Sequence, residues 1–133
     1  MNILNEIINE PIRITSPYGK RVHPITGKDS FHNGVDIAVP IGTQVYAPFD
    51  GVIIACVENK VGGRQLVIED KDRKYRITFS HLLDFVYNSG AFNKGELLCH
   101  SGNSGASTGA HLHVTIREHG FLVNPQKVSY DNI

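Results

Sequence analysis

Histidines and one aspartate occur in three short patterns along this chain, and their number suits a catalytic metal. The patterns are His32-Asn33-Gly34-Val35-Asp36, Ser80-His81-Leu82 and His111-Leu112-His113. Together they supply four imidazoles and one carboxylate. A catalytic zinc ion usually takes three protein ligands from His, Asp and Glu, and leaves one position open for water. Three ligands plus two further histidines therefore predict a single catalytic zinc per chain, with partners that handle protons.

The spacing within each pattern indicates which backbone must hold it. His111 and His113 run into Val114-Thr115-Ile116, which is typical of a strand, where alternate side chains share one face. On a straight strand, His32 and Asp36 would lie about 13 Å apart, too far for two ligands that each sit about 2 Å from one ion. Asn33-Gly34 is a turn signal, so we expect the chain to bend there and return His32 to Asp36 at the start of a strand.

The rest of the chain has the turn pattern of an all-β domain. Turn signals recur about every eight to twelve residues, as in sandwiches and barrels. Among the segments between these turn signals, Leu82 to Tyr87 is the one modest candidate for a helix or turn. Strands are expected at residues 43–47, 52–58, 65–69, 75–80, 97–100 and 111–118.

Length and charge limit the possible partners. A chain of 133 residues forms one domain and buries a core without disulfides. The 13 basic and 13 acidic side chains balance, which argues against nucleic acid or an anionic membrane surface as the partner. No apolar run is long enough for membrane insertion. We expect an N-terminal arm over residues 1–13, with Ile3, Leu4, Ile7 and Ile8 at helical spacing, and a domain over 14–133.

Both cysteines, Cys56 and Cys99, lie in apolar stretches. They are expected to be buried thiols that pack as small hydrophobic groups, with a disulfide as the alternative. Neither has the paired spacing of a zinc-binding cysteine.

Taken in order, four segments resemble the lysostaphin-type zinc endopeptidases, also called LytM-domain peptidases, which cut the peptide part of bacterial peptidoglycan. The segments are residues 16–27, 31–37, 80–82 and 102–113, and the resemblance extends from Ile14 to Asn124. It implies antiparallel sheets that form a narrow groove with zinc on its floor. It further implies that His32, Asp36 and His113 bind the zinc, and that His81 and His111 are the catalytic pair.

The resemblance also implies a substrate, a stem peptide or cross-bridge of peptidoglycan bound in extended form. The cleaved bond stays open between D-Ala–diaminopimelate and Gly–Gly. Thr115 stands where many relatives carry an acidic residue, which affects the contacts that orient the metal ligands. Tyr18 is either a phenolic donor near the oxyanion or a packed side chain. His23, His100 and His119 receive no role.

Two other functions are possible for such a sequence, and the N-terminus bears on where the protein acts. The chain could be a catalytically silent LytM-like module, with a structural role, for example in a phage particle, or as an activator of another hydrolase. Retention of all five site residues argues against the activating module. A structural role that retains the zinc site stays open to a turnover assay, because it predicts bound zinc without hydrolysis. The N-terminus lacks the features of a signal peptide. We therefore expect a protein that acts on the cell wall and is associated with a phage virion or released through a holin or lysis.

Overall fold

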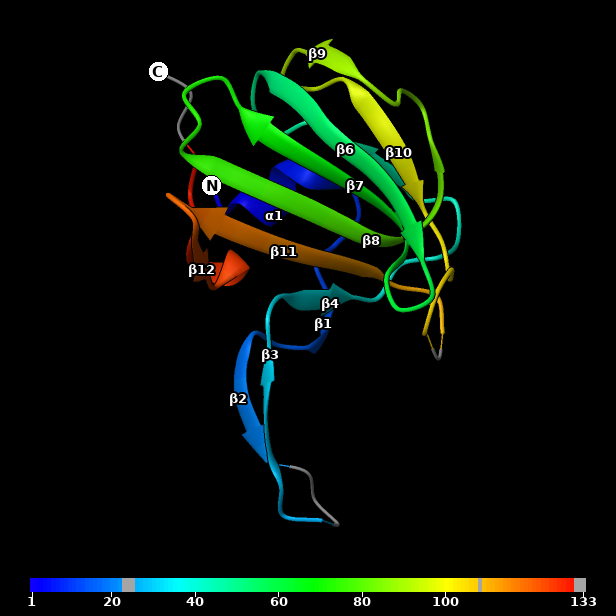
Figure 1. The fold of residues 1–133 in the computed structure, drawn as a ribbon, viewed down its shortest axis with the longest axis vertical. Helices are drawn as coiled ribbons and strands as arrows, with labels where there is room; N and C mark the ends of the chain where they lie inside the picture. The colour runs from blue at the N-terminus through cyan, green and yellow to red at the C-terminus, as the bar shows by residue number, and fades with distance from the viewer. Residues whose placement is uncertain (23–25, 108, 131–133) are drawn as a thin grey trace.

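The computed structural model describes residues 1–22, 26–107 and 109–130, and strands dominate it (Figure 1). No helix among these residues is long and apolar enough to cross a membrane. In chain order, the elements are α1 (Ile3–Ile7), β1 (Ile14–Ser16), β2 (Gly19–Val22), β3 (Asp29–His32), β4 (Val35–Ile37), β5 (Gln44–Tyr46), β6 (Gly51–Asn59), β7 (Gly63–Asp70), β8 (Tyr75–Phe85), β9 (Gly90–Phe92), β10 (Leu97–Ser101), β11 (Leu112–Glu118), β12 (Phe121–Val123) and a 3-10 turn, η1 (Pro125–Lys127).

The described strands pair antiparallel throughout, as the sequence predicts. Ten of them form one sheet, whose main path runs β1-β4-β11-β8-β7-β6-β9. Off this path, β12 pairs with β11, and β10 pairs with both β5 and β8. The remaining two strands, β2 and β3, form a separate hairpin that projects away from the main sheet (Figure 1).

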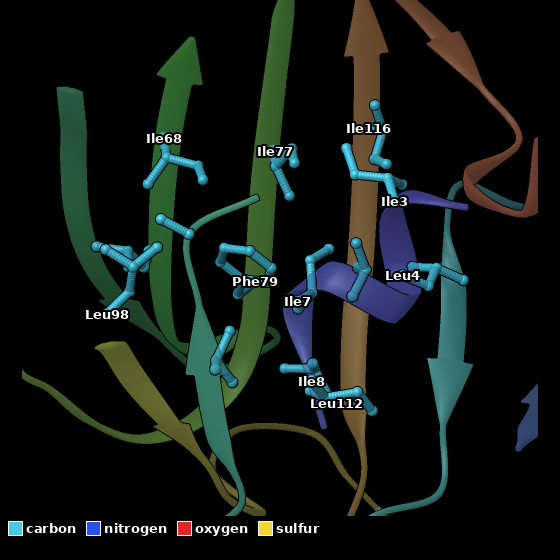
Figure 2. Close-up of a cluster of buried hydrophobic side chains, with 14 of the residues drawn as sticks. Ile3, Leu4, Ile7, Ile8, Ile68, Ile77, Phe79, Leu98, Leu112 and Ile116 are labelled. Atoms are coloured by element: carbon cyan, nitrogen blue, oxygen red, sulfur yellow. The ribbon is translucent and has the colours of Figure 1, made fainter. Parts of the chain in front are cut away.

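The central strands have one apolar face and one polar face. In β11, Leu112, Val114 and Ile116 are fully buried, while the residues between them face the other way. In β8, Ile77 and Phe79 are buried in the same core. Figure 2 shows these side chains gathered against α1. The helix therefore covers one face of the sheet at this point and leaves the polar face of β8 and β11 free for a site.

The N-terminal segment is helical, as its spacing predicts. Ile3, Leu4, Ile7 and Ile8 are each at most 1% exposed and belong to the main core (Figure 2). Asn2 caps the helix, because its Oδ1 accepts a hydrogen bond from the Leu4 amide at 3.0 Å. Packing against the sheet stabilises this short helix, which would be marginal alone. A domain boundary after residue 13 stays a prediction.

The expectation of a helix or turn from Leu82 to Tyr87 is wrong. Strand β8 continues to Phe85, and Leu82 pairs with Ser101 of β10. The backbone of His81 has φ of 63°, in the left-handed region, just before this extension. Pairing with β10 decides the local structure here, because tertiary contacts override a weak local pattern.

Both cysteines are free thiols. Cys99 is fully buried, and this burial raises the pKa of its thiol. Cys56 is only partly buried at the edge of the core, so the expected burial is confirmed in full for Cys99 alone.

Candidate metal centre and its groove

The chain bends between β3 and β4, as the Asn33-Gly34 pair predicts. Strand β3 ends at His32 and β4 begins at Val35. Gly34 lets the bend pack closely against β11, because a Cβ atom at position 34 would overlap the Val114 carbonyl and the Thr115 hydroxyl. The bend leaves His32 Nε2 3.6 Å from Asp36 Oδ2, so four residues of sequence separation become a side-chain contact.

The register of β11 against β4 adds the third side chain. His113 pairs directly with Asp36, and its Nδ1 lies 2.7 Å from Asp36 Oδ1. One donor atom from each of His32, Asp36 and His113 lies within 4.8 Å of the others. On His32, the other ring nitrogen, Nδ1, lies 3.0 Å from the Pro17 carbonyl, which can hold a proton there and leave Nε2 free.

Electrostatics keep Asp36 ionised. Burial alone would raise the pKa of this carboxyl, but three neighbours outweigh it. The hydrogen bond from His113 and the positive charges of His113, His111 and His32 together lower the pKa of Asp36 below its usual value. The carboxylate therefore offers an anionic oxygen to any cation held by the two histidines.

These three residues fit a zinc ion. Two nitrogens and one carboxylate oxygen are a donor set that catalytic zinc takes. Ligand atoms around a tetrahedral ion with bonds of about 2 Å are separated by about 3.3 Å. Each histidine nitrogen lies near that spacing from one of the two Asp36 oxygens, His32 Nε2 3.6 Å from Oδ2 and His113 Nδ1 2.7 Å from Oδ1.

Beside this cluster lie His81 and His111, with ring centroids 4.9 Å apart. Each ring has its Nδ1 2.7 Å from a backbone carbonyl, that of Ser104 for His81 and that of Gly109 for His111. A carbonyl only accepts, so Nδ1 carries the proton and donates. In a neutral ring, Nε2 is then left as a proton acceptor.

The pKa of His81 is lowered from its usual value. Burial is the main cause, and the positive charges of His111 and His113 add to it. The hydrogen bond to the Ser104 carbonyl and the charge of Asp36 oppose this shift without cancelling it. His81 is therefore neutral at pH 7 and able to accept a proton.

Both carbonyls belong to the glycine-rich segment 101–110, whose part in orienting the rings the sequence did not reveal. The segment is fixed to the sheet through Ser104, whose Oγ donates to the Leu82 carbonyl at 2.7 Å and accepts from the Arg64 amide at 3.0 Å. A Cβ on Gly63 would overlap the Ser104 backbone, so glycine is needed there. The clustered glycines at 62–63 and 102–105 are the signal that could have indicated this contact.

A cavity of about 720 Å³ opens over the cluster. All five site residues expected from the sequence line it, namely His32, Asp36, His81, His111 and His113. Sequence reasoning missed Arg21, Gln65 and Arg117, which line the same cavity from three different strands. Their positions depend on pairing across the sheet, which no local motif reveals.

The second nitrogen of His113 faces away from Asp36. Its Nε2 lies 3.1 Å from Asn33 Oδ1 and 3.0 Å from Thr115 Oγ1. Such partners fix the ring orientation and tautomer of a metal-binding histidine. Thr115 therefore occupies the place where the resemblance predicts an acidic residue, and it makes a hydrogen-bonding contact from there.

The other residues considered in the sequence lie elsewhere. Tyr18 packs edge-on against Phe31 with ring centroids 5.2 Å apart and does not line the cavity, which supports its packed alternative. His100 lies 2.8 Å from Asp84, and His119 follows β11 with a positive φ of 49°. His23 lies outside the described residues.

Comparison with known proteins gives a consistent result. The profile described as Peptidase family M23 matches residues 30–125. The peptidoglycan DD-endopeptidase ShyA of Vibrio cholerae is 35% identical over 119 residues, which cover 88% of this chain and 27% of ShyA. The chain thus spans about a quarter of the length of the curated relatives that it matches.

Solved structures agree with the sequence match. A zinc-containing peptidase from Vibrio cholerae superposes with a TM-score of 0.84 at 32% identity, over 94% of this chain and 39% of that one. The catalytic domain of lysostaphin from Staphylococcus simulans superposes with a TM-score of 0.74 at 28% identity, over 86% of this chain and 89% of that one. The match includes the strands that carry the cluster, since it extends over nearly the whole fold.

Proposed function

The chain belongs to peptidase family M23, and from this membership we propose that it is a zinc-dependent endopeptidase that hydrolyses peptide bonds of bacterial peptidoglycan. One observation carries the proposal. A His/Asp/His cluster and two further histidines with fixed tautomers line a single cavity. Binding a metal needs only the first three, so the two additional rings support hydrolysis rather than metal binding alone.

His32, Asp36 and His113 are the proposed ligands, through His32 Nε2, an Asp36 carboxylate oxygen and His113 Nδ1. When bound, zinc would lower the pKa of a water molecule and polarise the carbonyl of the scissile amide. The protein's own contribution is to orient the two histidine ligands. Asn33 and Thr115 hold the far side of the His113 ring, and Pro17 holds the far side of the His32 ring.

His81 and His111 are the proposed catalytic pair. One Nε2 takes a proton from the attacking water and later returns it to the leaving amine. The other ring, when protonated, donates a hydrogen bond to the oxyanion that forms at the amide carbonyl. The carbonyls of Ser104 and Gly109 support both roles, because they keep each Nδ1 proton in place and leave each Nε2 as the acceptor of a neutral ring. His111 Nε2 lies 3.5 Å from Asp36 Oδ1, next to the proposed metal ligands.

The cavity also suits an extended peptide. Its floor is the polar face of β7, β8 and β11, where Gln65 Nε2 donates to Ser80 Oγ at 2.9 Å. We propose that a stem peptide or cross-bridge lies across this floor between the β2-β3 hairpin and the segment 101–107. The proposed place of action is the bacterial cell wall, and the expected phage association stays a prediction. The catalytically silent alternative is not favoured, since the proton-handling pair is retained.

Mass spectrometry of digested sacculi tests the proposed function. Walls with diaminopimelate and walls with glycine bridges are treated with zinc-loaded protein and with its His81→Asn variant. Asn tolerates the left-handed backbone of position 81, which keeps the variant folded. New peptide termini with the wild type alone are the expected result. Absence of cleavage of both walls by protein with one zinc per chain would contradict the proposal.

A further inference from the structure

Two arginines from different strands line the cavity, and the reaction proposed above uses neither. Arg21 comes from β2 of the hairpin, and Arg117 comes from β11. Among the described residues that line the cavity, Asp36 is the one with a carboxylate, and the proposed metal centre uses it. A bound divalent cation would add further positive charge. The cavity therefore has an excess of positive charge over what its own residues balance.

The two arginines lie at different distances from the metal centre. Arg21 Nη1 donates to Ser16 Oγ, and that oxygen lies 3.4 Å from His32 Nδ1, so Arg21 is beside the metal-binding histidine. Arg117 is four residues after His113 on the same face of β11, which places their Cα atoms about 13 Å apart. An extended peptide spans that distance in about four residues.

Neither arginine is neutralised within residues 1–22, 26–107 and 109–130. No carboxylate of these residues forms an ion pair with Arg21 or Arg117. Arg76 differs, although it lies directly opposite Arg117 on β8, because Glu69 pairs with it at 2.9 Å. Arg117 Nη1 instead donates to the Gly120 carbonyl at 3.1 Å, and this side chain also lines a second, smaller pocket with Glu69 and Arg76 without forming an ion pair to Glu69.

A guanidinium keeps its charge at every pH of interest and offers a planar set of donors that matches a carboxylate. A glycine bridge presents no carboxylate to such a group. A stem peptide with a diamino acid presents a free side-chain carboxylate near the cross-link, and its end presents a main-chain carboxylate. The side chain and the chain end therefore present the same chemical group, a free carboxylate.

We propose that Arg21 and Arg117 are specificity-determining residues that bind free carboxylates of the substrate, Arg21 close to the scissile amide and Arg117 about four residues away. The inference rests on the proposed function, and it narrows the substrate to carboxylate-bearing stem peptides of the diaminopimelate type, in preference to neutral glycine bridges.

The test uses steady-state kinetics of the zinc-loaded protein on four substrates. These are a cross-linked diaminopimelate-type peptide dimer with free carboxylates, the same dimer with its side-chain carboxyls amidated, the same dimer with its terminal carboxyl amidated, and a glycine-bridged dimer. The two amidated dimers separate the two sources of carboxylate. We expect amidation at the recognised carboxylate to raise KM about tenfold, with kcat little changed.

Variants then assign the effect to each arginine. Arg21→Gln and Arg117→Gln are expected to raise KM for the free-carboxylate dimer about tenfold and to lose the preference over the matching amidated dimer. Lys substitutions restore part of the preference, because they keep the charge without the planar donor set. Arg76→Gln is the matched control and leaves KM unchanged, since Glu69 already neutralises that side chain. Zinc content stays at one per chain in all of them.

The outcomes separate this inference from the proposed function. Equal KM for free and amidated dimers in the wild type, or equal effects of Arg76→Gln and Arg117→Gln, would overturn the inference and leave the peptidase intact. Calorimetric binding to the zinc-loaded His81→Asn variant gives a second readout that does not need turnover. Selective binding of the free-carboxylate dimer by this variant, together with no cleavage of any dimer by the zinc-loaded wild type, would uphold the carboxylate sites and overturn the proposed hydrolysis.

Discussion

The two faces of β8 and β11 have opposite roles in the molecule. On one face, Ile77, Phe79, Leu112 and Ile116 are fully buried in the core next to α1 (Figure 2). On the other face, alternate residues of the same strands line the cavity, among them Thr78, Ser80, His113, Thr115 and Arg117. A strand sends successive side chains to opposite sides, so one backbone fixes both sets. Rigidity comes from the apolar face and chemistry from the polar face.

This contrast predicts that substitutions on the polar face alter metal binding and turnover, whereas substitutions on the apolar face alter stability. The largest effect is expected for His113→Ala on the polar face. Loss of one of three proposed ligands removes zinc, and turnover falls to background. Zinc stoichiometry by elemental analysis checks this, with His100→Ala outside the cavity as the control. Unchanged zinc content in His113→Ala would contradict the ligand assignment.

Removing a proton-handling ring should separate metal binding from catalysis. His81→Asn is expected to keep one zinc per chain and to lose about 10²- to 10⁴-fold in turnover, the usual contribution of a general acid or base. Turnover on a defined peptide and zinc content are measured on the same sample. Near wild-type rates would remove His81 from the mechanism.

On the apolar face, Phe79→Ala should show the reverse pattern. Deleting a fully buried phenyl ring costs about 3–5 kcal/mol of unfolding free energy. Below its unfolding transition, the variant is expected to bind zinc and turn over within about twofold of the wild type, since the ring does not line the cavity. Urea unfolding measures the loss of stability, and steady-state kinetics measures whether turnover is kept. A folded variant that has lost its zinc would show that the two faces are not separable.

Within the polar face, a residue that contacts a proposed zinc ligand should affect zinc affinity more than a neighbour that does not. Thr115→Val removes the hydroxyl that contacts His113 Nε2 and should weaken zinc binding about tenfold, at the low end for an outer partner of a ligand. Thr78→Val is the matched control, because Thr78 pairs with Thr115 across the sheet and also lines the cavity. Chelator competition measures both affinities. Equal affinities in the two variants would assign no orienting role to Thr115.

The smallest effect concerns pH. Burial lowers the pKa of His81 in the folded, metal-free protein below the value of about 6.5 expected for the unfolded chain. As pH falls through 6.5 toward the folded pKa, the unfolded chain binds the proton first, so the contribution of this residue to stability is lost. The urea midpoint of the metal-free wild type should therefore fall more between pH 7.5 and 5.5 than that of His81→Asn. Parallel declines would contradict the assigned shift.

Local patterns predicted the bend and the strand that form the His/Asp/His cluster, while the choice of these three residues as ligands came from the family resemblance. Asn33-Gly34 is a turn signal within the sequence itself, and the bend brings His32 to Asp36 as expected. The strand that carries His113 was predicted from its β-branched run, whereas its pairing with β4, which brings His113 to Asp36, was not predicted. The all-β class was predicted from the spacing of turns, and the antiparallel sheets were predicted from the family resemblance.

Long-range contacts could not be predicted from the same patterns. Leu82 to Phe85 was expected to leave the sheet, but pairing with β10 keeps it in β8. The carbonyls of Ser104 and Gly109 belong to a segment without ionisable groups, so nothing in its composition indicates that it orients two histidines. Arg117 lines the cavity because it lies four residues after His113 on the same face of β11. The bounds of this strand come from the structure and not from a local motif.

Diffraction from crystals of the zinc-loaded protein, with anomalous data on both sides of the zinc absorption edge, tests the central claim most directly. The predicted result is one anomalous peak per chain, within about 2.2 Å of His32 Nε2, an Asp36 carboxylate oxygen and His113 Nδ1. His81 and His111 should lie nearby without coordinating. A peak coordinated by His81 or His111, or a peak away from Asp36, would contradict the division of these five residues into ligands and proton carriers.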